Sequence, residues 1–259
     1  MCAGENASCQ LACLRAGETH VWLSFIDNDP APDENFFLAR LSETERARAK
    51  KIVPPDGRLH FIFAHTLLRA VLSQYHLVEP DAWQFGRGAQ GKPFIRAPAE
   101  APPLQFNLTH TRGLAACVIA LNAAAGVDAE YLEPHADLLD MARQFLPAPA
   151  ARELENLAGE QRTLRFYEHW TRQEACSKAC GAGLAALPEA MEPDPGWQFV
   201  QQCVSADHIL AAVVRGRPGK SVVFKLRTAG WELDAGKLRL KLIEPERAVA
   251  ARPIRQAHG

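Results

Sequence analysis

The chain of 259 residues is long enough to bury a substantial core, either as one large domain or as two of ordinary size. Its hydrophobic content of 47% with 23% charged residues is typical of a globular protein and excludes a disordered or membrane-embedded chain. The formal net charge of −1 gives no general basic surface, so a nucleic-acid binder is not expected and any affinity for anions must be local.

Neither a membrane span nor a secretion signal is evident. No apolar run approaches the ~20 residues that cross a bilayer, and the first twenty residues carry Glu5, Arg15 and Glu18 in place of a basic start and an apolar segment. We therefore expect a cytoplasmic protein. Seven cysteines without a C-x-x-C pair favour free, mostly buried thiols over a zinc site or disulfides.

The first half of the chain predicts one strand followed by two helices. Residues 20–26 alternate between two faces, which is typical of a strand. Residues 38–52 predict a short basic helix, with Ser42 and Glu45 forming a capping box. Residues 58–75 predict a long helix whose apolar positions form a core-facing stripe.

Basic residues are dense on these two predicted helices. Each one alone would be an ordinary solvated side chain. Together they form a candidate phosphate-binding patch on a nearly neutral protein. The patch consists of Arg46, Arg48, Lys50, Lys51, Arg58 and Arg69.

Two polar segments follow. The glycines of residues 86–94 allow close approach to a ligand and Lys92 offers a cation, although a plain hairpin explains the segment equally well. Residues 106–113 lead directly into the apolar strand 114–121. A single histidine beside a strand is more often structural, but the polar neighbours of His110 make a functional role about equally plausible.

The sequence Gly126-Val127-Asp128-Ala129-Glu130 ends an apolar run that starts at residue 114. Side chains two apart in a strand point the same way, so Asp128 and Glu130 are expected on one face. Helices are then predicted at 136–145, 152–157 and 162–180, the last ended by glycines at 181 and 183. Strands are predicted at 197–200, 209–214 and 222–226, with further strands or an exposed tail at 231–243.

On the helix 162–180, Glu174 and Lys178 lie four residues apart and therefore on one surface. The plain interpretation is an exposed ion pair worth a few tenths of a kcal/mol. The alternative combines them with Asp128 and Glu130, because carboxylates suit Mg²⁺ and an ammonium suits a phosphate. The tetrahedral His and Cys ligands of zinc are missing from these stretches.

Four motifs in order resemble those of the 4'-phosphopantetheinyl transferases, of the broad-specificity, two-lobed, surfactin-synthetase-activating type. That family shows G-[K]-P, F-N-x-S-H, G-x-D-x-E and W-x-x-K-E-A-x-x-K-x-x-G-x-G-L. Here they appear as Gly91-Lys92-Pro93, Phe106-Asn107-Leu108-Thr109-His110, Gly126-Val127-Asp128-Ala129-Glu130 and the segment from Trp170 to Leu184. The resemblance covers roughly residues 40–185.

The resemblance implies an α/β (α+β) fold of two pseudo-twofold-related lobes. Each lobe would be a small, mostly antiparallel sheet packed on a long helix, with the active site in the cleft between them. We accordingly divide the chain into a flexible arm (1–18), an N-terminal lobe (19–124), a C-terminal lobe with the metal site (125–244) and a frayed tail (245–259). A monomer is expected, without nucleic-acid or membrane partners.

The resemblance also implies the reaction, in which the phosphopantetheine arm of coenzyme A passes to a serine of an apo acyl or peptidyl carrier protein and 3',5'-ADP is released. Asp128, Glu130 and Glu174 would bind Mg²⁺, or Mn²⁺ in its place. Glu174 is also the candidate base for the serine, and Lys178 would contact the phosphates as they separate.

The remaining implied contacts are with coenzyme A. Lys92 and Pro93 would hold its nucleotide end, and Thr109 and His110 would contact its phosphates. Arg58 would meet the 3'-phosphate.

Three positions depart from the family pattern. Gln173 stands where lysine is usual, Thr109 replaces a serine, and Ala150 stands where a glutamate is frequent. Gln173 and Ala150 keep open a catalytically silent coenzyme A or nucleotide-binding protein of the same fold. A Mg²⁺-dependent phosphohydrolase is a third hypothesis, which would cleave coenzyme A without any carrier protein.

Overall fold

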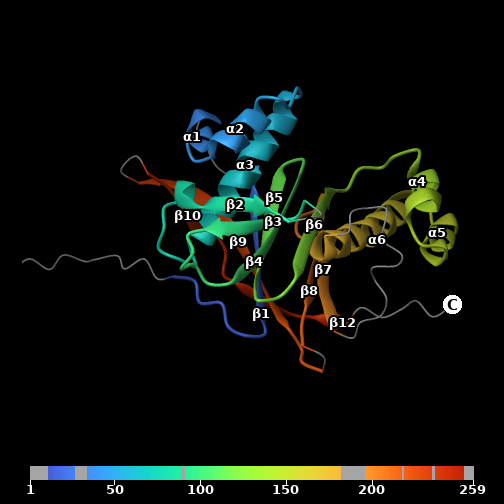
Figure 1. The fold of residues 1–259 in the computed structure, drawn as a ribbon. Helices are drawn as coiled ribbons and strands as arrows, with labels where there is room; N and C mark the ends of the chain where they lie inside the picture. The colour runs from blue at the N-terminus through green and yellow to red at the C-terminus, as the bar shows by residue number, and fades with distance from the viewer. Residues whose placement is uncertain are drawn as a thin grey trace, which may run out of the picture.

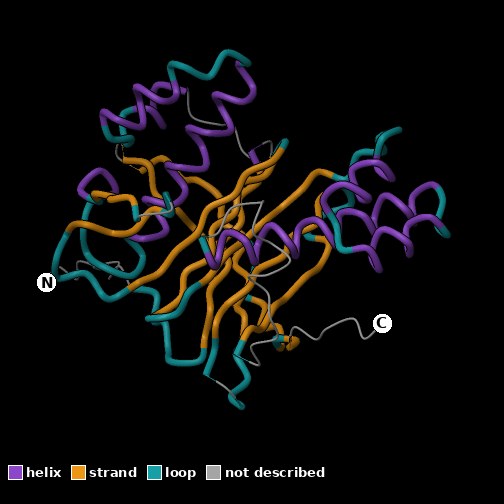
Figure 2. Tube along the Cα trace, turned by 45° about the vertical axis from the view of Figure 1, so that its right-hand side comes forward, coloured by secondary structure: helices purple, strands orange, loops and turns teal. Residues whose placement is uncertain are grey.

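The computed structural model describes residues 11–26, 34–88, 91–181, 196–217, 219–234 and 237–253. These residues form a mixed α+β fold in which two larger sheets and a two-stranded hairpin carry two separate groups of helices (Figures 1 and 2). The first ten residues of the predicted arm and the last six of the predicted tail lie outside the described residues.

The first sheet has the strand order β10-β9-β1-β5-β4, with β11 paired to β9. Its centre is β1 (Glu18–Phe25), which pairs antiparallel with β5 (Leu114–Leu121) and parallel with β9 (Val223–Asp234). The outer strands are β4 (Leu104–Thr111), β10 (Lys237–Leu242) and β11 (Arg247–Ala250). The predicted strand 20–26 is thus the buried centre of this sheet.

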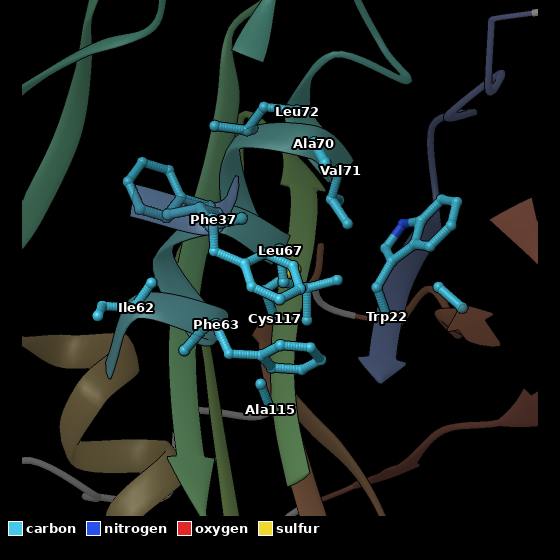
Figure 3. Packing of buried hydrophobic residues seen from close by; sticks show 14 of the residues in the cluster. Trp22, Phe37, Ile62, Phe63, Leu67, Ala70, Val71, Leu72, Ala115 and Cys117 are labelled. Carbon is cyan, nitrogen blue, oxygen red and sulfur yellow. The ribbon is translucent and has the colours of Figure 1, made fainter. Parts of the chain in front are cut away.

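Three helices cover this sheet: α1 (Glu34–Leu38), α2 (Glu43–Ala49) and α3 (Pro55–Leu72). The predicted stripe on α3 is confirmed, because its apolar positions from 61 to 72 are buried against β4 and β5. Figure 3 shows the resulting core, where aromatic and aliphatic side chains from α1, α3 and β1 meet β5.

The predicted capping box is also confirmed. The Ser42 hydroxyl accepts a hydrogen bond from the Glu45 backbone N–H at 3.3 Å, and the Glu45 carboxylate accepts one from the Ser42 N–H at 2.8 Å. This cap begins α2 at Glu43, so a helix running from residue 38 is wrong. Similarly, α3 begins at Pro55, where a proline fits the first helical turn, rather than at residue 58.

The second sheet is wholly antiparallel, in the order β12-β7-β8-β6. Its strands are β6 (Ala125–Tyr131), β7 (Trp197–Cys203), β8 (His208–Arg215) and β12 (Arg252–Pro253). The long helix α6 (Gly159–Cys180) packs on β6 and β8, and α4 (Leu138–Phe145) and α5 (Ala148–Glu155) pack against α6 (Figure 1). Gly181 ends α6 in a left-handed conformation with φ 74°, and the rest of the predicted glycine stop lies outside the described residues.

A short 3-10 helix (Pro80–Ala82) leads into the two-stranded hairpin of β2 (Gln84–Arg87) and β3 (Pro93–Ala97). The glycine-rich segment therefore includes a hairpin turn, as its plainer interpretation predicts.

The end of the chain departs from the predicted division. Strands β9, β10 and β11 belong to the first sheet, although 125–244 was assigned to a second lobe. Residues 247–253 are not frayed, since β11 pairs with β9 and β12 pairs with β7. Backbone N–H and C=O groups favour pairing between strands, and a strand's own sequence does not show which distant segment it pairs with. The pairing of β9 with β1, some two hundred residues earlier, is of this kind. The pseudo-twofold relation of the lobes stays a prediction.

The described cysteines, Cys13, Cys117, Cys176, Cys180 and Cys203, are free thiols. Among the described residues, no helix is both long and apolar enough to cross a membrane.

Candidate active site

The site lies where β6 packs directly against α6. Gly126 allows this contact, because a Cβ at this position would lie 2.0 Å from the carbonyl oxygen of Ala175 and 2.6 Å from the backbone nitrogen of Ala179. Both distances are shorter than real Cβ contacts, so only glycine fits here without displacing the helix. The close approach brings the end of β6 beside the last turns of α6.

Asp128, Thr109 and Lys178 form the centre of the site. The Lys178 ammonium donates to Asp128 Oδ1 at 2.6 Å and to the Thr109 hydroxyl at 3.2 Å. The Thr109 hydroxyl in turn donates to Asp128 Oδ1 at 3.1 Å. Asp128 is buried, with 3% of its surface exposed, and burial raises its pKa although Lys178 opposes the effect. Lys178 therefore stabilises the charged form of a carboxylate that burial disfavours. Its contact is with Asp128, so it does not form the simple surface ion pair with Glu174 that the plain interpretation predicts.

The other two acids share this environment. Burial, together with the charge of Asp128, raises the pKa of Glu130 to about 7. The pKa of Glu174 is raised by burial and by Asp128 and is lowered by Lys178. The indole N–H of Trp170 donates to Glu130 Oε1 at 3.2 Å, a contact that the sequence analysis missed because tryptophan there also fits an apolar helix face.

The donor set fits a hard divalent cation in its chemistry. Asp128 Oδ2 is buried and accepts no hydrogen bond from any described residue, and the neighbouring acids offer only oxygen ligands, which Mg²⁺ prefers. Among the described residues, however, no three His, Cys, Asp or Glu side chains are grouped as a ready metal cage. The assignment of Asp128, Glu130 and Glu174 to a metal therefore stays a prediction.

Lys92 reaches the same strand–helix junction from the hairpin. Its ammonium donates to the carbonyl oxygens of Ala179 at 2.8 Å and Ala125 at 3.1 Å, and burial lowers its pKa. Lys92 therefore binds the C-terminal turn of α6, where carbonyls lack helical partners. Pro93 is exposed at the start of β3.

His110 keeps an exposed surface at the end of β4, yet it is crowded by protein and by cationic groups. Burial of the ring, followed by the charges of His60, His65, Lys178 and Arg48, lowers the pKa of His110 to about 4. At neutral pH the ring is therefore uncharged and interacts with anions only through hydrogen bonds. His60, whose ring centroid lies 6.5 Å from that of His110, was not singled out from the sequence, where nothing distinguishes it from a core histidine.

The structure divides the predicted basic patch. Arg58 pairs with Glu34 on α1 at 3.2 Å. Arg69 is only 1% exposed and forms an ion pair with Glu45 at 2.7 Å, while its other nitrogen donates to the carbonyls of Pro80 and Trp83. Arg69 is thus a core residue, and its inclusion in a phosphate patch is wrong. The sequence presents Arg69 as one more basic residue on a helix and does not indicate that Glu45 would meet it.

Of the three departures from the family pattern, Thr109 belongs to the Asp128 centre, whereas Gln173 and Ala150 make their contacts elsewhere. The Gln173 amide donates to the carbonyl of Phe145, at the end of α4, at 2.7 Å. Ala150 is buried in the cluster of apolar side chains that joins α4, α5 and α6. Neither contact involves the three residues that hold one another at the site.

A buried aspartate, two acids of raised pKa and an ammonium at one strand–helix junction are typical of an active site. Comparison with known proteins also indicates an enzyme. Residues 124–214, from just before β6 into β8, match the model of the 4'-phosphopantetheinyl transferase superfamily. The chain belongs to this superfamily of enzymes, which transfer phosphopantetheine from coenzyme A to carrier proteins.

Three relatives illustrate the similarity. The chain is 32% identical over 211 residues to the 4'-phosphopantetheinyl transferase HetI of Nostoc sp., which covers 77% of this chain and 88% of HetI. It is 30% identical over 194 residues to a putative 4'-phosphopantetheinyl transferase of Synechocystis sp., covering 74% of this chain and 77% of that protein. Identity to AcpT of Salmonella typhimurium is 30% over 116 residues, covering 45% of this chain and 59% of AcpT.

Proposed function

We propose that this protein transfers the 4'-phosphopantetheine arm of coenzyme A to a serine of an apo acyl or peptidyl carrier protein in a Mg²⁺-dependent reaction. The observation that carries the proposal is the contact of Asp128 with Lys178 beside Glu130 and Glu174, within the segment that matches the superfamily.

In this reaction the serine oxygen forms a bond to the phosphorus of the phosphopantetheine arm. The phosphoanhydride bond breaks and 3',5'-ADP leaves with the bond's electron pair. Glu174 takes the serine proton, a role that suits a carboxylate whose pKa is raised by burial. Lys178 neutralises the charge that grows on the departing phosphate.

Asp128, Glu130 and Glu174 would hold the metal ion, with the orphan Asp128 Oδ2 as one ligand atom. When bound, Mg²⁺ or Mn²⁺ supplies positive charge to the phosphate oxygens of the substrate. The ammonium of Lys178 also compensates the charge of the buried Asp128 carboxylate.

Coenzyme A would contact the side of the site formed by β4 and the hairpin. His110 and Thr109 come from the end of β4, Pro93 is the first residue of β3, and Lys92 directly precedes it. Because Lys92 uses hydrogen bonds on α6 and Arg58 is paired with Glu34, we assign these two residues weaker contacts with the nucleotide than the family resemblance implies.

Intact-mass spectrometry tests the proposal. An apo acyl carrier protein is incubated with this protein, coenzyme A and Mg²⁺, alongside the variant Glu174→Ala. We expect the carrier to gain the mass of one phosphopantetheine with the wild type and not with the variant. No gain with acyl and peptidyl carriers, despite coenzyme A binding, would favour the catalytically silent binding protein.

A further inference from the structure

Two edge strands from different sheets meet at the site. β4 is the last strand of the first sheet and β6 the last of the second, and the two lie side by side (Figure 1). Within the part of the chain that the structure describes, the backbone of β4 pairs with β5 and that of β6 with β8. The edge N–H groups of β6 that face β4 therefore need other partners, because a buried unpaired N–H is costly.

Side chains of β4 supply these partners. Asn107 Oδ1 accepts a hydrogen bond from the Val127 backbone N–H at 3.1 Å, and Thr111 Oγ1 accepts one from the Tyr131 N–H at 3.2 Å. Residues 107 and 111 point to one face of β4, since alternate side chains of a strand share a face. Both contacts join residues twenty apart, so β4 and β6 run in the same direction with a fixed register.

These two anchors enclose the acidic pair. The Val127 N–H directly precedes Asp128, and the Tyr131 N–H directly follows Glu130. Asn107 is the more deeply placed anchor, with 7% of its surface exposed, and Val127 is fully buried. A shift of β6 against β4 would therefore move both carboxylates relative to Thr109.

We propose that Asn107 is a positioning residue that sets the register of β6 and thereby the placement of Asp128 and Glu130 for metal binding and transfer. This inference rests on the proposed function for its catalytic consequence, whereas the anchor itself rests on the hydrogen bond alone. An apolar residue of similar shape would leave the Val127 N–H buried without an acceptor.

The chain offers a matched control. Gln198 is also a buried amide, 7% exposed, and its Oε1 accepts a hydrogen bond from the backbone N–H of Val222 at 2.8 Å. Gln198 lies on β7, which is separated from β6 by β8. Gln198→Met removes an equivalent hydrogen bond away from Asp128 and Glu130. It therefore reports the effect of losing a buried amide acceptor that does not position the two acids.

The experiment compares Asn107→Leu with Gln198→Met in the full chain. Hydrogen exchange measured by mass spectrometry reports the protection of residues 126–131, and titration with Mn²⁺ reports metal affinity. We expect Asn107→Leu to accelerate exchange of that segment and to weaken Mn²⁺ binding by about 10- to 100-fold, as loss of a residue that orients metal ligands does. Gln198→Met should change neither by more than about twofold, since distant sites act independently.

The anchor is refuted if Asn107→Leu changes exchange of residues 126–131 and Mn²⁺ affinity no more than Gln198→Met does. If Asn107→Leu fails to fold, Asn107→Ala removes the same acceptor with less bulk and is compared in its place. If the wild type modifies no carrier protein, the proposed function fails while the exchange result still decides the anchor. If the wild type binds no Mn²⁺, the metal site fails and exchange again decides.

Discussion

The contact between β6 and α6 at Gly126 makes a quantitative prediction. A Cβ at this position would lie 2.0 Å from the Ala175 carbonyl oxygen, so Gly126→Ala must separate strand and helix by about 1 Å to restore the shortest real contact of 3.0 Å. The 2.6 Å contact between Lys178 and Asp128 would lengthen towards about 3.6 Å, beyond a hydrogen bond. Overpacking of this kind costs about 1–3 kcal/mol of folding stability. A 1 Å displacement in an active site costs about 100-fold in rate.

The assay combines urea unfolding with the rate of carrier modification. Gly57→Ala is the matched control, because a Cβ at residue 57 would meet its nearest neighbour, Ile52, at 3.4 Å, an ordinary contact, and alanine is tolerated in a helix. We expect Gly126→Ala to lower the free energy of unfolding and to abolish most of the transfer, and Gly57→Ala to do neither. A Gly126→Ala protein with wild-type stability and rate would refute the close packing of β6 on α6.

Three further predictions concern other residues. Burial alone would raise the pKa of Glu45, but its bonds to His65, Ser42 and Arg69 and the charge of Arg69 lower it to about 2. The lowered pKa therefore contributes roughly 3 kcal/mol of folding stability, which is fully present above pH ~4.5 and is lost as the pH falls towards ~2. Urea unfolding between pH 6 and pH 2.5 should show most of this loss. In Glu45→Gln the free energy of unfolding should depend less on pH over the same range. Lys92→Met should lower the free energy of unfolding by about 1–3 kcal/mol, because charged hydrogen bonds to two carbonyls are lost. The control Lys220→Met, at an exposed lysine, should leave the free energy of unfolding unchanged. Equal urea midpoints for the two variants would contradict a stabilising role of Lys92. Gln173→Lys should leave the transfer rate within about threefold of wild type, because residue 173 contacts the end of α4; a large gain in activity would show that Gln173 had impaired the enzyme.

The local parts of the fold were predictable from sequence because their causes are local. Ser42 and Glu45 form the capping box that their spacing predicts, and the apolar stripe of α3 is buried. The observed helix boundaries differ from the predicted ones where a single residue determines the start, as Pro55 does in the first turn of α3. Helices and their caps depend on neighbours within four residues, which the sequence displays directly.

Long-range placement was not predictable in the same way. The partner of β1 that starts at Val223 lies at the other end of the chain, and no local pattern specifies that pairing. Arg69 illustrates the same difficulty at the level of one side chain. On a helix it resembles any solvated cation, and only the folded chain brings Glu45 and two carbonyls around it.

The candidate site shows both situations. The spacing of Glu174 and Lys178 correctly placed Lys178 near acidic groups, but the carboxylate that its ammonium contacts is Asp128, fifty positions earlier. Lys92 was expected to bind a nucleotide, whereas the structure gives it two carbonyls at the β6–α6 junction. Asn107 lies in a motif whose Thr109 and His110 were the candidate site residues. Its own hydrogen bond, from the Val127 N–H, depends on β4 lying beside β6, which the sequence does not show.

We propose that the acids of β6 and α6 serve the transfer of a phosphopantetheine arm to a protein. The most direct measurement quantifies 3',5'-ADP and modified carrier protein in the same reaction, with and without apo carrier and with and without Mg²⁺. We predict one 3',5'-ADP for each modified carrier, and neither product when the carrier or the Mg²⁺ is omitted. Release of 3',5'-ADP from coenzyme A without carrier would identify a phosphohydrolase and contradict the account.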